Sequence, residues 1–190
     1  MLLSEDFFRP ENTAIRRKSP SPFARQLVES GYLSTQSITS VLDFGCGVGA
    51  DVLYYREAGL IADGFDPHSP FGWVDVISRS SYHLVVCMFV LNVIPGADSR
   101  KAIVQRVREL MMPNGFALLV ARSSICIERE ARSRRWEKYQ DGYISSPSRR
   151  TFQKGFTDSE LIELFGGGCS VVDFDFKVTD SCAVILNLNG

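Results

Sequence analysis

The segment Asp43–Gly49, with the sequence DFGCGVG, constrains the fold more than any other part of the chain. It continues the short apolar run that begins at Val41, and it precedes a helix-like segment, residues 50–58, which Gly59 ends. Its three glycines allow a tight turn and the close approach of a ligand to the backbone. A strand, a glycine loop and a helix in this order are typical of α/β domains that bind ligands at the carboxyl ends of parallel strands.

The rest of the chain alternates between strand-like and helix-like segments. Ser21 and Pro22 are typical of the first positions of a helix that ends before Gly31, and Thr157 and Glu160 form the pattern of a capping box. We expect strands at 41–44, 61–65, 74–77, 82–88 and 116–121, helices at 22–30, 50–58, 99–112, 126–140 and 158–165, a Ser/Pro-rich loop at 142–155, and closing strands at 170–176 and 182–188. This order predicts an α/β fold with a Rossmann-like, mostly parallel sheet, helices on both faces and a C-terminal antiparallel hairpin.

Length and composition favour one domain, because 190 residues with 45% hydrophobic side chains suffice for one sizeable core. We assign residues 1–20 to a polar N-terminal arm and residues 21–190 to the domain, with a basic helical insertion at about 123–155. The longest apolar run, 84–90, is too short to cross a bilayer, and residues 1–10 lack the pattern of a signal peptide. These features predict a cytoplasmic protein with no membrane partner.

The five cysteines are an odd number without a close C-x-x-C pair, so the sequence suggests neither a disulfide framework nor a metal site. Positive charge is concentrated in two places. Residues 122–155 hold nine Lys or Arg against four Asp or Glu, and Arg16, Arg17 and Lys18 form a second cluster. Such local basic patches decide binding partners more than the net charge of −1 does. A nucleic acid is therefore a candidate partner.

The ligand of the glycine loop is constrained by two acidic residues. Asp66 ends the second expected strand, at the position where a carboxylate accepts both hydroxyls of a ribose. The spacing Gly45-x-Gly47-x-x-Ala50 also satisfies a loose dinucleotide-binding pattern, which leaves a nicotinamide-dependent oxidoreductase as an alternative. Asp43 argues against it, because a carboxylate there suits an ammonium group and repels a pyrophosphate.

Together, Val41–Gly49, Asp66, residues 84–94 and the turn Pro113-Asn114-Gly115 resemble the ordered motifs of class I S-adenosylmethionine-dependent methyltransferases. The resemblance covers residues 40–122. It implies that the cofactor is S-adenosyl-L-methionine, that the loop holds its amino-acid part, and that Asp66 binds the ribose. The cofactor-binding residues that it implies are Asp43, Phe44, Gly45, Cys46, Gly47, Gly49, Asp66 and Pro67, with Cys87, Met88 and Phe89 beside the sulfonium. The acidic residue that usually contacts adenine has no clear counterpart; Asp75 is the nearest candidate.

Three shorter motifs, Thr13–Arg17, Val90–Ile94 and Thr151–Lys154, resemble those of the methyltransferase-like proteins associated with bacterial DNA phosphorothioation. This narrower resemblance implies a DNA-modification context, with proteins of such a system as partners. The segment after Met88 lacks the Asn/Asp-Pro-Pro-aromatic motif of enzymes that methylate base amines, and the chain has no Pro-Cys pair for methylation of cytosine C5.

The sequence therefore favours a methyltransferase whose acceptor is open, with nucleic acid as one candidate. His68, just after Asp66, is the candidate general base. The candidate nucleic-acid contacts are Arg16, Arg17, Lys18, Arg134, Arg135, Arg149, Arg150 and Lys154. The alternative, a protein that is not an enzyme, is an accessory protein that binds both the cofactor and nucleic acid without turnover.

Overall fold

The computed structural model describes residues 4–189 and contains a six-stranded and a three-stranded sheet. The strands of the large sheet are β1 (Ser40–Phe44), β2 (Ile61–Phe65), β3 (Tyr82–Met88), β4 (Met111–Arg122), β8 (Cys169–Val172) and β9 (Ser181–Leu188). Their spatial order is β2-β1-β3-β4-β9-β8. The first four strands are parallel, and β9 runs antiparallel to both of its neighbours. The predicted fold class is confirmed.

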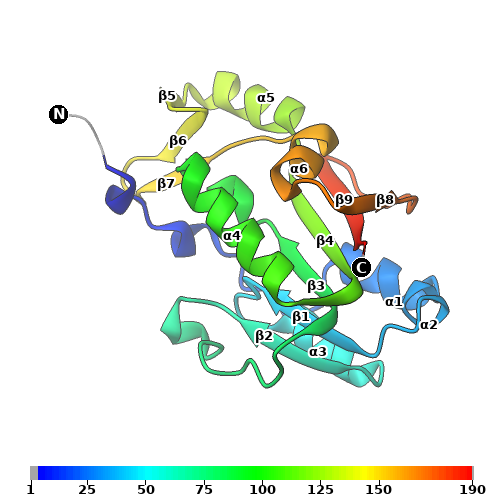
Figure 1. Cartoon of the computed structure of the whole chain (residues 1–190). Helices are drawn as coiled ribbons and strands as arrows, with labels where there is room; N and C mark the ends of the chain where they lie inside the picture. Colours follow the sequence, from blue (N-terminus) through cyan, green and yellow to red (C-terminus); the bar gives the residue numbers. More distant parts are fainter. Residues whose placement is uncertain (1–3, 190) are drawn as a thin grey trace.

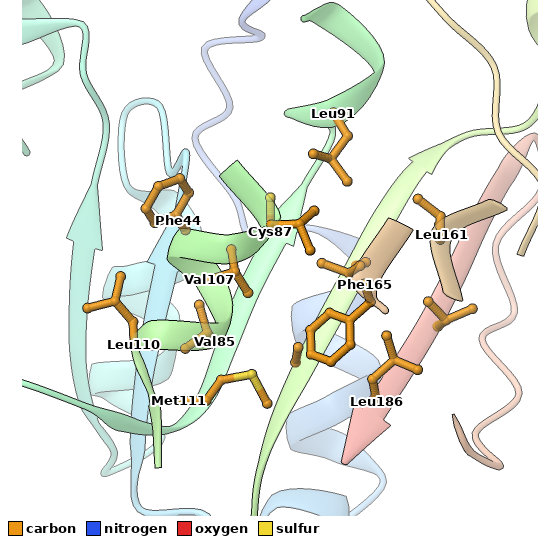
Figure 2. Close-up of a cluster of buried hydrophobic side chains, with 14 of the residues drawn as sticks. Phe44, Val85, Cys87, Leu91, Val107, Leu110, Met111, Leu161, Phe165 and Leu186 are labelled. Carbon is orange, nitrogen blue, oxygen red and sulfur yellow. The ribbon is translucent and has the colours of Figure 1, made fainter. Parts of the chain in front are cut away.

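Helices cover both faces of this sheet (Figure 1). On one face lie α1 (Pro22–Glu29), α2 (Tyr32–Thr35) and α3 (Ala50–Glu57), and on the other lie α4 (Ala97–Glu109) and α6 (Asp158–Phe165). Side chains of β3 alternate between the two cores: Val85 and Cys87 pack toward α4 and α6, whereas Leu84 and Val86 pack toward α1–α3. Figure 2 shows the core between the sheet and helices α4 and α6. Each large side chain buried there stabilises the fold by about 1.5–3 kcal/mol.

The predicted helix starts are formed by local hydrogen bonds. The Ser21 hydroxyl accepts from the backbone N–H of Ala24 at 3.0 Å, and Pro22 is the first residue of α1. At α6, the Thr157 hydroxyl and the Glu160 carboxylate form both bonds of the capping box. These interactions satisfy backbone N–H groups that have no partner within the helix.

The prediction of a short strand at 74–77 is wrong. The segment between β2 and β3 has one 3-10 turn, Ser69–Phe71, and otherwise no regular element. The buried Asp63 carboxylate holds this segment by accepting hydrogen bonds from the backbone and hydroxyl of Ser78 and from the Tyr82 hydroxyl. Val74 is 37% exposed, so the segment lacks a buried apolar face with which to extend the sheet.

The basic insertion also differs from its prediction. Helix α5 spans Ser124–Arg134 and stops at Arg135, whose φ of 55° is left-handed. The expected loop contains strands instead: β5 (Glu137–Tyr139), β6 (Gly142–Ser146) and β7 (Thr151–Gln153) form the small antiparallel sheet. In the closing hairpin, β8 ends at Val172, because the following aromatic residues Phe174 and Phe176 pack against the face that holds α1 and α2.

The N-terminal arm is packed against the small sheet. Phe8, 3% exposed, lies in a cluster with Ile144 and Phe152, and the backbone N–H of Arg9 donates to the carbonyl of Arg150 at 2.8 Å. In Figure 1 the arm, in dark blue, runs beside β6 and β7 and then along the end of the large sheet. No helix within residues 4–189 is long and apolar enough to cross a membrane.

Candidate cofactor and acceptor site

A cavity of about 770 Å³ lies at the carboxyl ends of the parallel strands, where ligands bind in sheets of this kind. Its wall comes from four parts of the chain: the glycine loop, the loop after β2, the segment after β3, and residues 10–17 of the arm, which we call the strap. The lining includes Gly45, Cys46, Gly47, Asp66, Pro67, His68 and Phe71 from the first two parts, Met88 to Val90 and Asn92 to Ile94 from the third, and Pro10, Glu11, Thr13, Ala14, Ile15 and Arg17 from the strap. Gln153 of β7 also lines it.

The glycine loop presents its backbone at one point of this cavity. Gly45, Gly47 and Gly49 all have positive φ, at 85°, 56° and 80°. A side-chain carbon on Gly45 would lie 2.2 Å from Val90, and one on Gly49 would lie 2.1 Å from Trp73. Gly47 has no neighbouring atom within 4 Å of that position, so its open side is available to a ligand. The loop thus has two glycines for packing and one for ligand approach.

Asp43 lies beneath the loop as a carboxylate without a donor. It is 4% exposed and receives no hydrogen bond from residues 4–189. Burial, reinforced by the nearby carboxylates of Asp51 and Asp66, raises the pKa of Asp43, and Arg17 opposes this effect. Asp51, by contrast, accepts from the backbone of Ser21 at 2.6 Å and pairs with Arg17 at 3.3 Å. A buried carboxylate with no partner fits a cationic ligand group such as an ammonium.

Asp66 is fixed on both of its oxygens. Oδ2 accepts from the backbone N–H of Gly47 and Oδ1 from that of His68, both at 2.9 Å. Each carboxylate oxygen has a second lone pair, so the group can still accept two ligand hydroxyls. His68 lies in the cavity wall with its ring 4.6 Å from that of Phe71.

The structure separates the predicted cofactor residues into those that line the cavity and those that do not, and Asp43 is among the second, buried at the end of β1. Gly45, Cys46, Gly47, Asp66, Pro67, Met88 and Phe89 line the cavity. Phe44 and Cys87 instead belong to the core beneath α4, and Gly49 is covered by Trp73. Burial raises the pKa of the Cys87 thiol to about 12 and raises that of Cys46 as well, so neither thiol is a nucleophile at neutral pH. Asp75 is exposed and is not part of the lining.

The candidate nucleic-acid contacts lie in different surroundings. Arg17 lines the cavity, and Lys154 is held by Glu160 at 3.0 Å. The Arg149 guanidinium donates to the backbone carbonyl of Asn12, and Arg150 lies over the Phe7 ring at 5.8 Å. Exposed positions are occupied by Arg16, Lys18, Arg134 and Arg135, with Arg134 within 3.9 Å of Glu130.

Sequence reasoning did not assign Asn92, Gln153 or the strap residues Thr13–Ile15 to the site. All of them line the cavity. Their signal was present, because they belong to the three short motifs that carry the narrower resemblance, but nothing in the sequence indicated that these motifs meet in space.

Residues 8–161 match the model of a protein family described as a methyltransferase domain, whereas no curated protein matches the chain. Among solved structures, the PH0226 protein from Pyrococcus horikoshii is similar with a TM-score of 0.64 and 14% identity, covering 96% of this chain and 100% of that one. The CcbJ methyltransferase from Streptomyces caelestis has a TM-score of 0.59 and 14% identity, with coverage of 90% and 91%. A 1,6-didemethyltoxoflavin-N1-methyltransferase from Burkholderia thailandensis has a TM-score of 0.55 and 15% identity, with coverage of 90% and 80%.

The strand order, with the glycine loop and the cavity at the carboxyl ends of the parallel strands, is that of the class I methyltransferase fold. The family match extends over more than half of the sequence. The chain therefore belongs to the methyltransferase domain family.

Proposed function

We propose that the glycine loop and Asp66 hold S-adenosylmethionine, and that the acceptor binds in the part of the cavity under the strap. The observation that carries this proposal is the buried Asp43 carboxylate, which accepts no hydrogen bond from residues 4–189 and stands at the end of β1, two residues before Gly45. When bound, the cofactor supplies an electrophilic methyl group on a sulfonium. Asp43 then compensates the ammonium, Asp66 orients the ribose, and the strap excludes water, so the chain contributes mainly by positioning.

We further propose that the acceptor is a nucleic acid in a DNA-modification context, with proteins of such a system as partners. The support is the basic surface next to the cavity. Arg16 and Lys18 are exposed on the arm, whose residues 10–17 contribute to the wall of the cavity, and Arg134 and Arg135 are exposed at the end of α5. Because the cavity is a recess whose wall includes the strap, a base of a duplex must leave the stack to enter it. An unpaired or single-stranded base enters at lower cost.

Fluorescence anisotropy with single- and double-stranded DNA and RNA tests this acceptor. Neutralised phosphates release counterions, so log affinity falls linearly with log salt, by about 0.9 for each contact on duplex DNA. Replacing Arg16 and Lys18 together by Ala should make this slope shallower by about 2 units. The matched control replaces Lys101 and Arg106, two exposed cations of α4, and should leave the slope unchanged. If none of the four probes binds at low salt, the nucleic-acid acceptor is wrong.

A small-molecule acceptor is the second candidate, favoured by the volume of the cavity, about 770 Å³, and by the mostly uncharged strap residues in its wall. The Burkholderia structure carries 1,6-didemethyltoxoflavin together with S-adenosylhomocysteine, so this fold accommodates a small acceptor in that protein. Comparing methylated nucleic acids, proteins and metabolites in cells with and without the gene separates the two candidates. Binding of cofactor with no methylated product in any fraction would favour the accessory role instead.

A further inference from the structure

The side chain of Asn92 is buried in the cavity wall with one polar atom unsatisfied. Asn92 lies in the 3-10 turn Leu91–Val93 that follows β3, and it is 2% exposed. Its Nδ2 donates to Oε1 of Gln153 at 3.0 Å. Its Oδ1 is buried and receives no hydrogen bond from any residue in the described range 4–189.

Such an oxygen is uncommon, because nearly all buried polar groups in proteins are paired and an unpaired one destabilises the fold. Within residues 4–189, two other side-chain atoms are fully buried and unpaired, the hydroxyls of Tyr32 and Tyr55, and they belong to side chains that do not line the cavity. Asn92 does line it. Among these three residues, Asn92 is thus the one whose missing donor a ligand in the cavity is near enough to replace.

The position of this oxygen is held from two sides. The backbone N–H of Lys154 donates to the Asn92 carbonyl at 2.8 Å, so β7 is attached to the turn through main chain as well as through Gln153. Arg100, 3% exposed, donates to the carbonyls of Ile94 and Pro95, just after the turn, and also pairs with Asp141 of the small sheet. Because these bonds already fix the turn, the Asn92 side chain loses little conformational freedom when a ligand binds to it, which favours binding.

We propose that Asn92 Oδ1 accepts a hydrogen bond from an N–H or O–H group of the methyl acceptor and thereby positions that group toward the cofactor. The acceptor would then be an amine, amide or hydroxyl compound that keeps a proton at or beside the reacting atom. This proposal rests on the methyltransferase function and deepens it. It holds for a nucleobase and for a small molecule alike.

A cofactor analogue tests the proposal without knowledge of the acceptor. Sinefungin has a carbon bearing a protonated amine where S-adenosylmethionine has its methyl-bearing sulfur, so its N–H groups extend toward the acceptor. S-adenosylhomocysteine has no group there. Calorimetry gives the ratio of their affinities. In Asn92→Leu the affinity for sinefungin should fall about 10- to 100-fold relative to that for S-adenosylhomocysteine, as expected for the loss of a hydrogen bond to a charged group.

Two further variants distinguish the oxygen from the structure around it. Asn92→Asp keeps an acceptor at this position and should retain or increase the preference for sinefungin. Gln153→Leu removes the partner of Nδ2 but leaves Oδ1, so it should lower the ratio less than Asn92→Leu does.

An unchanged ratio in Asn92→Leu overturns the proposal, as does an equal loss in Gln153→Leu. If Asn92→Leu does not fold, Asn92→Asp decides: loss of the preference in this variant overturns the proposal. A wild-type protein that fails to bind S-adenosylhomocysteine would instead refute the cofactor site itself. A negative result with nucleic acids leaves the ratio, and therefore this proposal, unaffected.

Discussion

At the scale of single residues, glycines with similar backbone angles serve different purposes. Gly47 and Gly59 both have positive φ, at 56° and 85°, and both have open space where a side chain would begin. Only Gly47 lies in the cavity wall; Gly59 is exposed at the end of α3. A substitution at either position costs backbone strain of about 1–3 kcal/mol, but only one of them takes space from a ligand.

Gly47→Val should therefore abolish binding of S-adenosylhomocysteine, while Gly59→Val should bind it as wild type does. Both variants should lose a similar amount of stability, because the strain is of the same kind. Calorimetry for binding and thermal unfolding for stability check the pair. Wild-type affinity in Gly47→Val would show that the cofactor does not approach the loop at this residue.

The buried Asp43 carboxylate lowers the stability of the cofactor-free protein, although we propose that cofactor binding requires it. Its pKa in the folded protein is raised above the ordinary value, chiefly by burial. A carboxyl of this kind favours the protonated form on folding, so its contribution to stability is present at low pH and is lost as the pH rises through the raised pKa. Above that pH the ionised group destabilises the protein without cofactor, and the same charge attracts the ammonium.

Asp43→Asn should accordingly raise the melting temperature of the cofactor-free protein at neutral pH, by roughly 2–4 °C for each kcal/mol recovered. The gain should disappear at a pH low enough to protonate Asp43 in both folded and unfolded chains. The variant should also bind S-adenosylmethionine more weakly. A melting temperature that does not rise would show that Asp43 carries no unpaired charge in the free protein.

At the scale of elements, the sequence predicted those whose signals are local. The caps of α1 and α6 lie within four residues of the groups that they bind, and the run that forms β3 is apolar apart from His83. The small sheet was missed because its strands have only three to five residues and few apolar side chains, and because Phe152 packs against Phe8, which is far away in the sequence. Strand propensity depends on such distant partners.

Phe8→Ala should release the arm without unfolding the core, because its contacts are confined to the cluster with Ile144 and Phe152. The lost packing is worth about 3 kcal/mol. Trypsin should then cut after Arg16, Arg17 or Lys18 much faster than in wild type, as mass spectrometry can establish. Ile15→Ala is the control, because Ile15 is 78% exposed and its replacement should not change the rate. Equal rates in Phe8→Ala and wild type would contradict the anchoring role of Phe8.

At the scale of the whole molecule, the part of the cavity that we assign to the cofactor could be located from the sequence, and the part that we assign to the acceptor could not. The loop and Asp66 are separated in the sequence by one helix, α3, and one strand, β2, so spacing alone relates them. The strap, Asn92 and Gln153 come from three distant segments, and only the fold brings them to one cavity. Their side chains are also ordinary polar or apolar groups, which carry no chemical signature of a site.

Cofactor binding should stabilise the whole chain by mass action. At a concentration of S-adenosylhomocysteine 100 times its Kd, the gain is about 2.7 kcal/mol, which corresponds to a rise of roughly 5–10 °C in melting temperature for a chain of this size. NAD should give no rise, since Asp43 disfavours a pyrophosphate. A shift with NAD instead would point to the oxidoreductase alternative.

The anchoring of the arm also fixes an order of assembly during synthesis. The strand, glycine loop and Asp66 follow one another closely, so the cofactor pocket can form early on the ribosome. Phe8 has been made by then, but its partners Ile144 and Phe152 have not. The arm must stay unpacked while most of the chain is translated. The enclosure for the acceptor is therefore completed late, and a nascent chain acquires its cofactor pocket before it can enclose an acceptor.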